Sequence, residues 1–274
     1  MISLLAPLAV PPATLLEACA SGSQQDVQGL LAKGAAVNAA GKDGETALLT
    51  AARRGHVELL KILLAAGATT DARRWNGETA LHAAVASGRP AALSLLLTKV
   101  LAVDAAENRR GQTALHYAAA EGRTQMVQQL LAAGAKVDAP SLSGATPLWL
   151  AAQGGHDETV VALLAANADP AAIGPEGYRP IHLAARACHP AAIVALLAGH
   201  ANVVDINART TVGSTALHLA TTQNCLSTVQ ALAAGGADLN AKDARSQTAL
   251  DQARRRRFPE VIKFLEEKAT PPKP

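Results

Sequence analysis

The residues of this sequence that could do chemistry are eight histidines, three cysteines and 22 carboxylates. Histidine and carboxylate groups serve as general acids and bases, and cysteine serves as a nucleophile or, together with histidine, as a zinc ligand. Their spacing favours none of these roles. The sequence holds no CxxC, no Cys/His cluster at zinc spacing, no HExxH, no GxxxxGK[ST] and no glycine-rich dinucleotide loop. We therefore expect no enzyme activity, no metal and no cofactor.

The cysteines are Cys19, Cys188 and Cys225, which are few, odd in number and far apart. This pattern predicts neither a disulfide framework nor a structural metal, and packing explains all three side chains. It favours a reducing compartment. We therefore expect a cytoplasmic protein, with a nuclear or an exported location as the alternatives.

The histidines fall into a register. Four of them directly follow a Leu or Ile in a recurring motif: His82, His116, His182 and His218. Three more lie where a short helix should break: His56, His156 and His189. Recurrence at fixed positions indicates structure rather than catalysis. The elements that position these residues must therefore repeat as well.

One motif, Gly-x-Thr-(Ala/Pro)-Leu, recurs along the chain. Its copies begin at Gly44, Gly77, Gly111, Gly144 and Gly213, with a variant at Gly177 and a last copy from Ser246 to Leu250. Successive glycines are 33, 34, 33, 33 and 36 residues apart, and the last copy follows after another 33. The threonine is a good helix N-cap, and Ala or Pro is well tolerated at the position after it.

The residue pattern within each repeating unit predicts two short helices. Small pairs such as Ala51-Ala52 and Ala118-Ala119 follow the Leu by three and four residues, where they let a neighbouring helix approach closely. Paired leucines mark the second helix. That helix ends at a residue that tolerates a left-handed conformation, such as Gly67, Gly134 or Asn167.

These units resemble the ankyrin repeat, whose motif T-P-L-H-x-A-A-x-x-G-H is matched at Leu81-His82 and Leu115-His116, and whose ending G-A-D-V-N is matched at 236–240. The resemblance implies an all-α solenoid of helix-turn-helix pairs joined by β-hairpin-like loops. It also implies that the motif histidine is a local hydrogen-bonding partner of the Thr-capped turn. We expect an N-terminal extension (1–12), an ankyrin-repeat domain (13–268) and a Pro-rich tail (269–274). The repeats are expected at 13–40, 41–73, 74–106, 107–140, 141–173, 174–208, 209–242 and 243–268.

Some units depart from the pattern. The third lacks the helix-ending Gly, and the sixth is about three residues longer at 200–207. The first and last units differ as polar caps of a solenoid do. The run Arg254–Arg257 fits a solvated cap, a targeting patch or a phosphate-binding site. The apolar start MISLLAPLAV fits either a signal peptide or an extension of the first repeat.

The composition narrows the classes of partner. Hydrophobic residues make up 49 % and charged residues 17 %, as in globular chains, while aromatics are only 2 %. The net charge of +3 is small for a nucleic-acid binder, and no apolar run is long enough to span a membrane. We therefore expect a protein partner, no nucleic acid and no membrane, and an elongated monomer.

The resemblance implies that partners contact the hairpin tips and the exposed side of the first helices. Trp75 is the most informative candidate, because a hairpin tip has no core to hold a Trp; the alternative is that it lies flat on the next hairpin. Trp149 takes the motif histidine's position and is expected to be half-buried. The candidate partner-binding residues are Lys42, Arg53, Arg54, Arg73, Arg74, Trp75, Arg109, Arg110, Leu142, Tyr178 and Arg186.

The basic residues around Trp75 favour an acidic or mixed partner segment. The function that we predict is a scaffold or adaptor that binds a partner protein on the concave face, which the resemblance places at the hairpin tips and first helices. Two alternatives remain open: a regulatory or inhibitory subunit that occludes an enzyme, and a host-directed effector of a bacterium or protist.

Overall fold

The structure is a computed structural model that describes residues 14–100, 102–198 and 204–269. The expected N-terminal extension, with its alternative of a signal peptide, lies outside the described residues. The same is true of the Pro-rich tail after Ala269 and of part of the long end of the sixth repeat.

The all-α prediction is confirmed: the described residues form paired helices, two short 3-10 turns and no β-strand. The described residues up to Arg109 form one compact unit, here called unit A, and the described residues from Arg110 onward form a second, unit B. The helices of unit A are α1 (Leu15–Ser21), α2 (Gln24–Ala32), α3 (Ala47–Arg54), α4 (Val57–Ala65), α5 (Ala80–Ser87) and α6 (Pro90–Leu97), with the 3-10 turn η1 at Lys42–Gly44.

Unit B continues the same alternation of helices. It contains α7 (Ala114–Ala120), α8 (Thr124–Ala132), α9 (Pro147–Gly154), α10 (Asp157–Ala165), α11 (Pro180–Arg186), α12 (Pro190–Leu197), α13 (Ala216–Thr222), α14 (Leu226–Ala234), α15 (Ala249–Arg256) and α16 (Pro259–Ala269), with the turn η2 at Pro175–Gly177.

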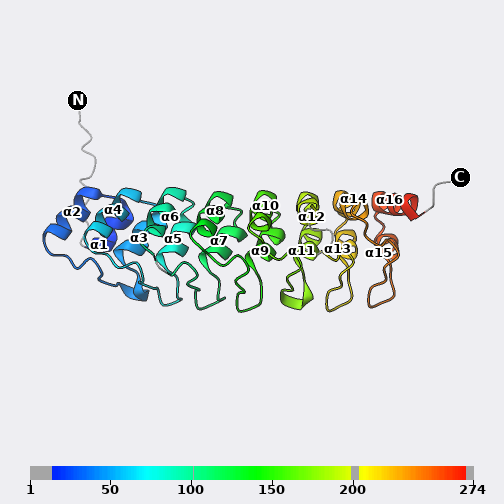
Figure 1. Ribbon diagram of the computed structural model, residues 1–274, viewed down its shortest axis with the longest axis horizontal. Coiled ribbons are helices and arrows are strands. Elements are labelled where there is room, and N and C mark those ends of the chain that lie inside the picture. Colours follow the sequence, from blue (N-terminus) through cyan, green and yellow to red (C-terminus); the bar gives the residue numbers. More distant parts are fainter. Residues whose placement is uncertain (1–13, 101, 199–203, 270–274) are drawn as a thin grey trace, which may run out of the picture. The chain divides into compact units, whose positions relative to one another are not determined.

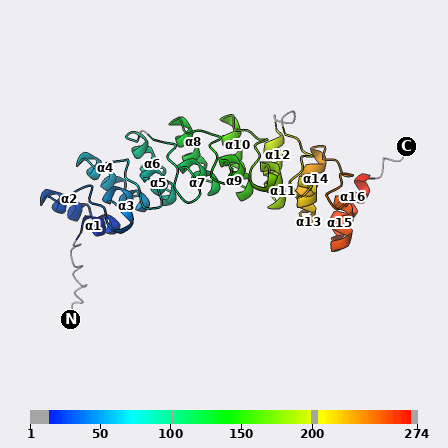
Figure 2. The same cartoon turned by 90° about the horizontal axis from the view of Figure 1, so that it is seen from below.

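Within each unit the helices form two rows. In unit A the first helices α1, α3 and α5 lie side by side, and the second helices α2, α4 and α6 form the other row (Figures 1 and 2). In unit B the odd-numbered helices α7 to α15 form one row and the even-numbered helices α8 to α16 the other. In both units the hairpin loops project on the side of the first-helix row (Figure 1).

Small residues let the first helices pack closely. The predicted Ala pairs are all fully buried, at 0 % exposure: Ala51, Ala52, Ala118, Ala119, Ala151, Ala152, Ala184 and Ala185. Leucines fill the space between the rows, and Leu60, Leu63 and Leu130 are also at 0 %. The core is therefore built mainly from Ala, Leu, Val and Ile at close helix–helix distances, in keeping with an aromatic content of only 2 %.

The helix termini are satisfied as the motif predicts. Thr46 and Thr146 accept hydrogen bonds at Oγ1 from the N–H groups of Leu49 and Trp149, both at 3.3 Å. The residues just beyond the second helices, Gly67, Gly134 and Asn167, have φ of 85°, 87° and 63°. The third repeat, which lacks such a residue, instead ends α6 with Thr98 in the right-handed helical region, at φ −70°.

Three of the motif histidines, His116, His182 and His218, join neighbouring repeats, which confirms that they are part of the repeat structure. His116 Nδ1 accepts the Thr113 N–H at 3.1 Å, so the proton lies on Nε2, which is 3.1 Å from the Ala145 carbonyl of the next repeat. His218 makes the same two bonds, with Thr215 and with the Gln247 carbonyl. The neutral imidazole thus caps one helix and holds the next hairpin.

His182 should make unit B sensitive to acid. Burial lowers its pKa from the usual 6.5, and its Nε2 lies 2.8 Å from the Ala208 carbonyl. The unfolded chain therefore binds a proton more readily, so stability is full above pH 6.5 and falls as the pH drops from there toward the folded pKa. We expect His182→Gln, whose amide can accept the Arg179 N–H, to lose less stability between pH 7.5 and pH 5 in thermal unfolding. An equal loss in both proteins would contradict this role.

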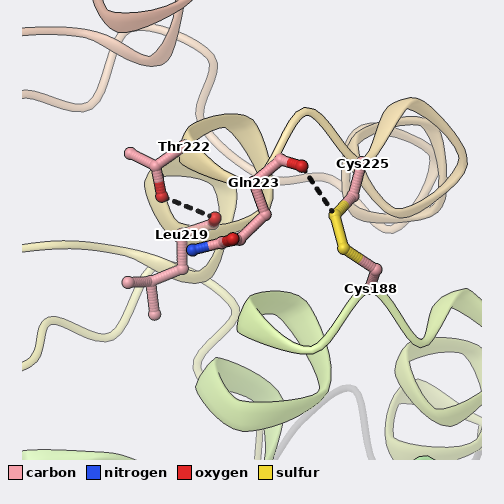
Figure 3. Close-up of a disulfide and its surroundings, with 5 residues drawn as sticks. All are labelled: Cys188, Leu219, Thr222, Gln223 and Cys225. Atoms are coloured by element: carbon pink, nitrogen blue, oxygen red, sulfur yellow. Dashed lines mark hydrogen bonds between the residues drawn. A yellow bond between two sulfur atoms is a disulfide. The ribbon is translucent and has the colours of Figure 1, made fainter.

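The expectation for the cysteines is wrong for two of them. Cys188, after α11, forms a disulfide with Cys225, before α14, and their Cα atoms are 5.5 Å apart (Figure 3). Cys19 fits the packing interpretation, because it is fully buried and burial raises the pKa of its thiol to about 11. The disulfide lies within unit B and joins two successive repeats.

Candidate protein-binding surface

The hairpin tips of unit A are shaped by left-handed residues. Asp43 and Gly44 in η1 have φ of 67° and 74°, and Gly77 has φ of 82°. A Cβ on Gly77 would lie 2.8 Å from the backbone nitrogen of Asn108, so only glycine allows the next segment to approach this closely. The tips therefore stack backbone against backbone.

Hydrogen bonds between hairpins fix the backbone on both sides of Trp75. The Trp75 N–H donates to the Asp43 carbonyl at 2.9 Å, and the Asn108 N–H donates to the Asn76 carbonyl at 2.6 Å. The Asn108 side chain also donates to the Trp75 carbonyl at 3.4 Å. Residue 75 is thus held by a neighbour on each side, although it lies at the tip of a loop.

The Trp75 side chain is largely open to solvent, at 64 % exposure. A rigid indole on a fixed backbone loses little conformational entropy when a partner covers it. Trp149, the other Trp of the chain, is half-buried in unit B, and its Nε1 donates to the Tyr178 carbonyl at 3.1 Å. The two tryptophans therefore have different roles, and that of Trp149 matches its predicted structural position.

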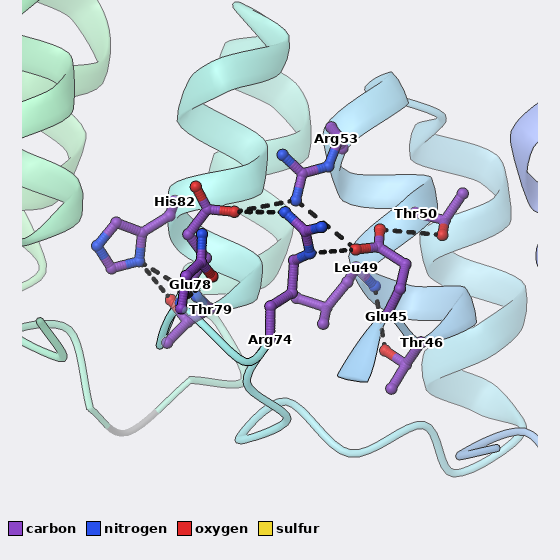
Figure 4. Close-up of polar contacts among 10 residues, drawn as sticks. Glu45, Thr46, Leu49, Thr50, Arg53, Arg74, Glu78, Thr79 and His82 are labelled. Atoms are coloured by element: carbon purple, nitrogen blue, oxygen red, sulfur yellow. Dashed lines mark hydrogen bonds and ion pairs between the residues drawn. The ribbon is translucent and has the colours of Figure 1, made fainter. Parts of the chain in front are cut away.

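Two of the predicted surface arginines are engaged in an ion-pair network. Arg53 and Arg74 both lie 3.2 Å from Glu78, and Arg74 Nε lies 2.8 Å from Glu45 (Figure 4). Thr50 adds a hydrogen bond to Glu45 at 3.1 Å. This network links the end of α3 to the hairpin that carries Trp75.

The network balances its own charge. Burial raises the pKa of Glu78, but the hydrogen bonds from Arg53 and Arg74 outweigh this effect and leave the pKa below its usual value. Two carboxylates then face two guanidinium groups. Arg53 and Arg74 therefore contribute more to positioning the hairpin than to the charge that a partner meets.

The remaining predicted cations of unit A point outward. Lys42, Arg54, Arg73 and Arg109 are all exposed. Arg73 also donates from Nη1 to the Ala106 carbonyl at 3.1 Å, which ties it to the following connection. These four residues, together with Trp75, are the accessible part of the predicted site in unit A.

The predicted residues of unit B form two separate features. Leu142 is 75 % exposed on a hairpin tip, and its N–H donates to the carbonyl of Arg110, also exposed, at 2.8 Å. Tyr178 and Arg186 come together: the guanidinium carbon lies 5.1 Å from the ring centroid, which is a cation–π contact.

Comparison with known proteins agrees with this geometry. A family model described as "Ankyrin repeats (3 copies)" matches residues 15–106, 76–141, 99–174, 115–210 and 181–272, which together cover 15–272. The chain belongs to the ankyrin-repeat family. A search of curated proteins gave no match. Ankyrin repeats are protein–protein interaction modules that bind protein partners and typically lack enzymatic activity.

The last ankyrin repeat carries the arginine run at the end of α15. Arg254 pairs with Glu266 of α16 at 2.7 Å, and Arg257 takes a left-handed conformation, with φ of 61°, as the helix C-cap. Arg255 and Arg256 are exposed. Cations at a helix C-terminus offset the helix dipole, so these contacts fit the interpretation as a solvated cap.

In the part of the chain that the structure describes, three or more His, Cys, Asp or Glu side chains nowhere gather closely enough to hold a metal ion. Within the same residues no helix combines the length and apolar character needed to cross a bilayer.

Proposed function

We propose that the chain is a scaffold or adaptor that holds a partner protein against the hairpin tips and first helices of unit A. The Trp75 surface, meaning Lys42, Arg54, Arg73, Trp75 and Arg109, is the centre of this site. The observation that carries the proposal is an indole at 64 % exposure on a backbone held from both sides. Trp and Arg are the residue types enriched at binding hot spots.

The partner segment is acidic or mixed in charge. The Trp75 surface presents four cations, while the nearby Asp43 is exposed and weakens the positive field. Glu45 and Glu78 already balance Arg53 and Arg74. Affinity should therefore rest mainly on Trp75 and fall only modestly as salt rises.

Leu142, Tyr178 and Arg186 are a second proposed contact region, confined to unit B. Leu142 offers an apolar side chain at 75 % exposure, and the Tyr178–Arg186 pair offers a planar cationic group. Neither feature is needed to fill the core. We propose that Leu142 and the Tyr178–Arg186 pair contact a protein partner through unit B itself.

Site-directed photo-cross-linking tests the proposal. A photoreactive residue at Lys42 or Arg54 should cross-link to the partner in cells, while the same residue at Lys61, on the solvent side of α4, should not. Mass spectrometry of the adduct identifies the partner and shows whether it is an enzyme under control or a bound client. Equal cross-linking from Lys61 would place the contact elsewhere and refute the proposed surface.

A further inference from the structure

The repeat geometry brings two positions of neighbouring repeats into contact. One is the left-handed residue one or two positions after the first helix, and the other is the residue that precedes the second helix of the next repeat. In unit B, a Cβ on Gly122 would collide with the ring of His156, and a Cβ on Gly155 with the ring of His189. In unit A, Gly22 and His56 meet in the same way, with 3.0 Å from the built Cβ to the ring.

Cys188 and Cys225 occupy these two positions. Cys188 has φ of 65°, close to the 64° of Gly122 and the 68° of Gly155, and Cys225 is the residue before α14, as His156 is before α10. Their Cα–Cα distance of 5.5 Å lies within the range of protein disulfides. The solenoid register itself therefore places the two sulfur atoms together.

The two cysteines differ in their access to solvent. Cys188 is exposed at the turn after α11, while Cys225 is buried at 7 % exposure. Cys225 Sγ also lies 3.5 Å from the Gln223 carbonyl, which can accept the S–H of the reduced form. An incoming thiolate can therefore reach the disulfide from the Cys188 side, and Cys225 is the shielded leaving group.

We propose that Cys188 and Cys225 form a reversible thiol–disulfide exchange site that takes a small thiol such as glutathione. The incoming thiolate attacks Cys188 Sγ, the Cys188–Cys225 bond breaks, and Cys225 leaves as a thiolate that takes a proton. A second glutathione thiolate attacks the mixed disulfide at its glutathione sulfur, which gives glutathione disulfide and frees Cys188. Glutathione disulfide reverses both steps and re-forms the cross-link.

The consequence is a redox-dependent clamp within unit B. Each repeat of a solenoid is stabilised by its neighbours, so a covalent link between two repeats supports the packing of α11 and α12 on α13 and α14. The two cysteines are 37 positions apart, and closing a loop of that length restricts the unfolded chain. Oxidation should therefore raise the thermal stability of unit B.

The experiment uses the full chain equilibrated with glutathione or with glutathione disulfide, followed by alkylation, mass spectrometry and thermal unfolding. In the oxidised sample Cys188 and Cys225 should resist alkylation even after unfolding, whereas in the reduced sample Cys188 should be labelled in the folded protein and Cys225 once the chain is unfolded. Cys19 is the internal control, because its burial should block labelling in the folded protein in either buffer. Oxidation should raise the midpoint of unfolding by about 5 to 10 °C.

Two variants make the test specific without risk to the fold. Cys188→Gly alone and the double variant Cys188→Gly/Cys225→His introduce the residues that other repeats carry at these positions, so both should fold as the reduced wild type does. Their unfolding midpoints should be the same in both glutathione buffers. Free thiols at Cys188 and Cys225 after treatment with glutathione disulfide would overturn the proposal, as would a cross-link whose reduction leaves the midpoint unchanged.

Discussion

Replacing Trp75 with Ala is expected to weaken partner binding by about 2 kcal/mol or more, which is about 30-fold in the dissociation constant. The thermal unfolding of the chain should be unchanged. The reason is that 64 % of Trp75 is exposed, so little buried area is lost from the fold, whereas a bound partner would cover the whole indole. Titration calorimetry with the partner that cross-linking identifies measures the loss of affinity, and a thermal scan of each variant measures its stability.

Trp149 provides a matched control within the same chain. Its indole donates to the Tyr178 carbonyl at 3.1 Å, so Trp149→Ala should lower stability through a lost contact between repeats. Trp149→Phe leaves Trp75 as the only Trp, and its fluorescence should then be readily quenched by iodide and protected by the partner. Wild-type affinity in Trp75→Ala, or no protection from iodide, would show that the partner binds elsewhere.

Much of the fold could be predicted because it is local and periodic. The Thr caps, the motif histidines and the buried Ala pairs each follow from a residue type at a fixed place in the repeat. Trp149 illustrates this well: it replaces a motif histidine, and its Nε1 reaches a carbonyl 29 residues ahead, as His116 Nε2 does. The position in the repeat determines the contact even when the residue changes.

The ion-pair network could not be predicted with the same ease. Arg53 and Arg74 both suggested an acidic partner, but the structure directs them toward Glu45 and Glu78. Long side chains have many rotamers, and their choice of partner depends on distances across repeats that a motif does not give. One signal was present: Glu45 and Glu78 both follow a tip glycine, so the stacking of hairpins brings them close to the same arginines.

The disulfide was missed for a different reason. Cysteines 37 positions apart look unrelated along the chain. Aligning the repeats places Cys188 in the position of Gly155, and Cys225 in the position of His189. The contact between these positions joins one repeat to the next, so a comparison of positions within one repeat does not show it. Contacts between successive repeats therefore need a two-repeat alignment.

Shortening a buried leucine tests the claim that neighbouring repeats depend on one another. Leu148 is fully buried at the start of α9, which packs against both α7 and α11. Leu148→Ala removes apolar contacts and leaves a cavity, at a cost of about 2 to 5 kcal/mol in the free energy of unfolding. Urea unfolding followed by circular dichroism should show this loss as a lower midpoint.

Leu142→Ala is the control for this prediction, because it removes the same atoms at a site that is 75 % exposed. It should leave the urea midpoint nearly unchanged. In a Trp75→Phe background, the fluorescence of Trp149 reports on the fifth repeat alone. When Leu148→Ala is added, this fluorescence should change at the same urea concentration as the helical signal. The reason is that α9 cannot unfold without exposing the faces of α7 and α11. If Trp149 reports unfolding at a lower urea concentration than the bulk of the helices, the repeats of unit B are less cooperative than nearest-neighbour stacking requires.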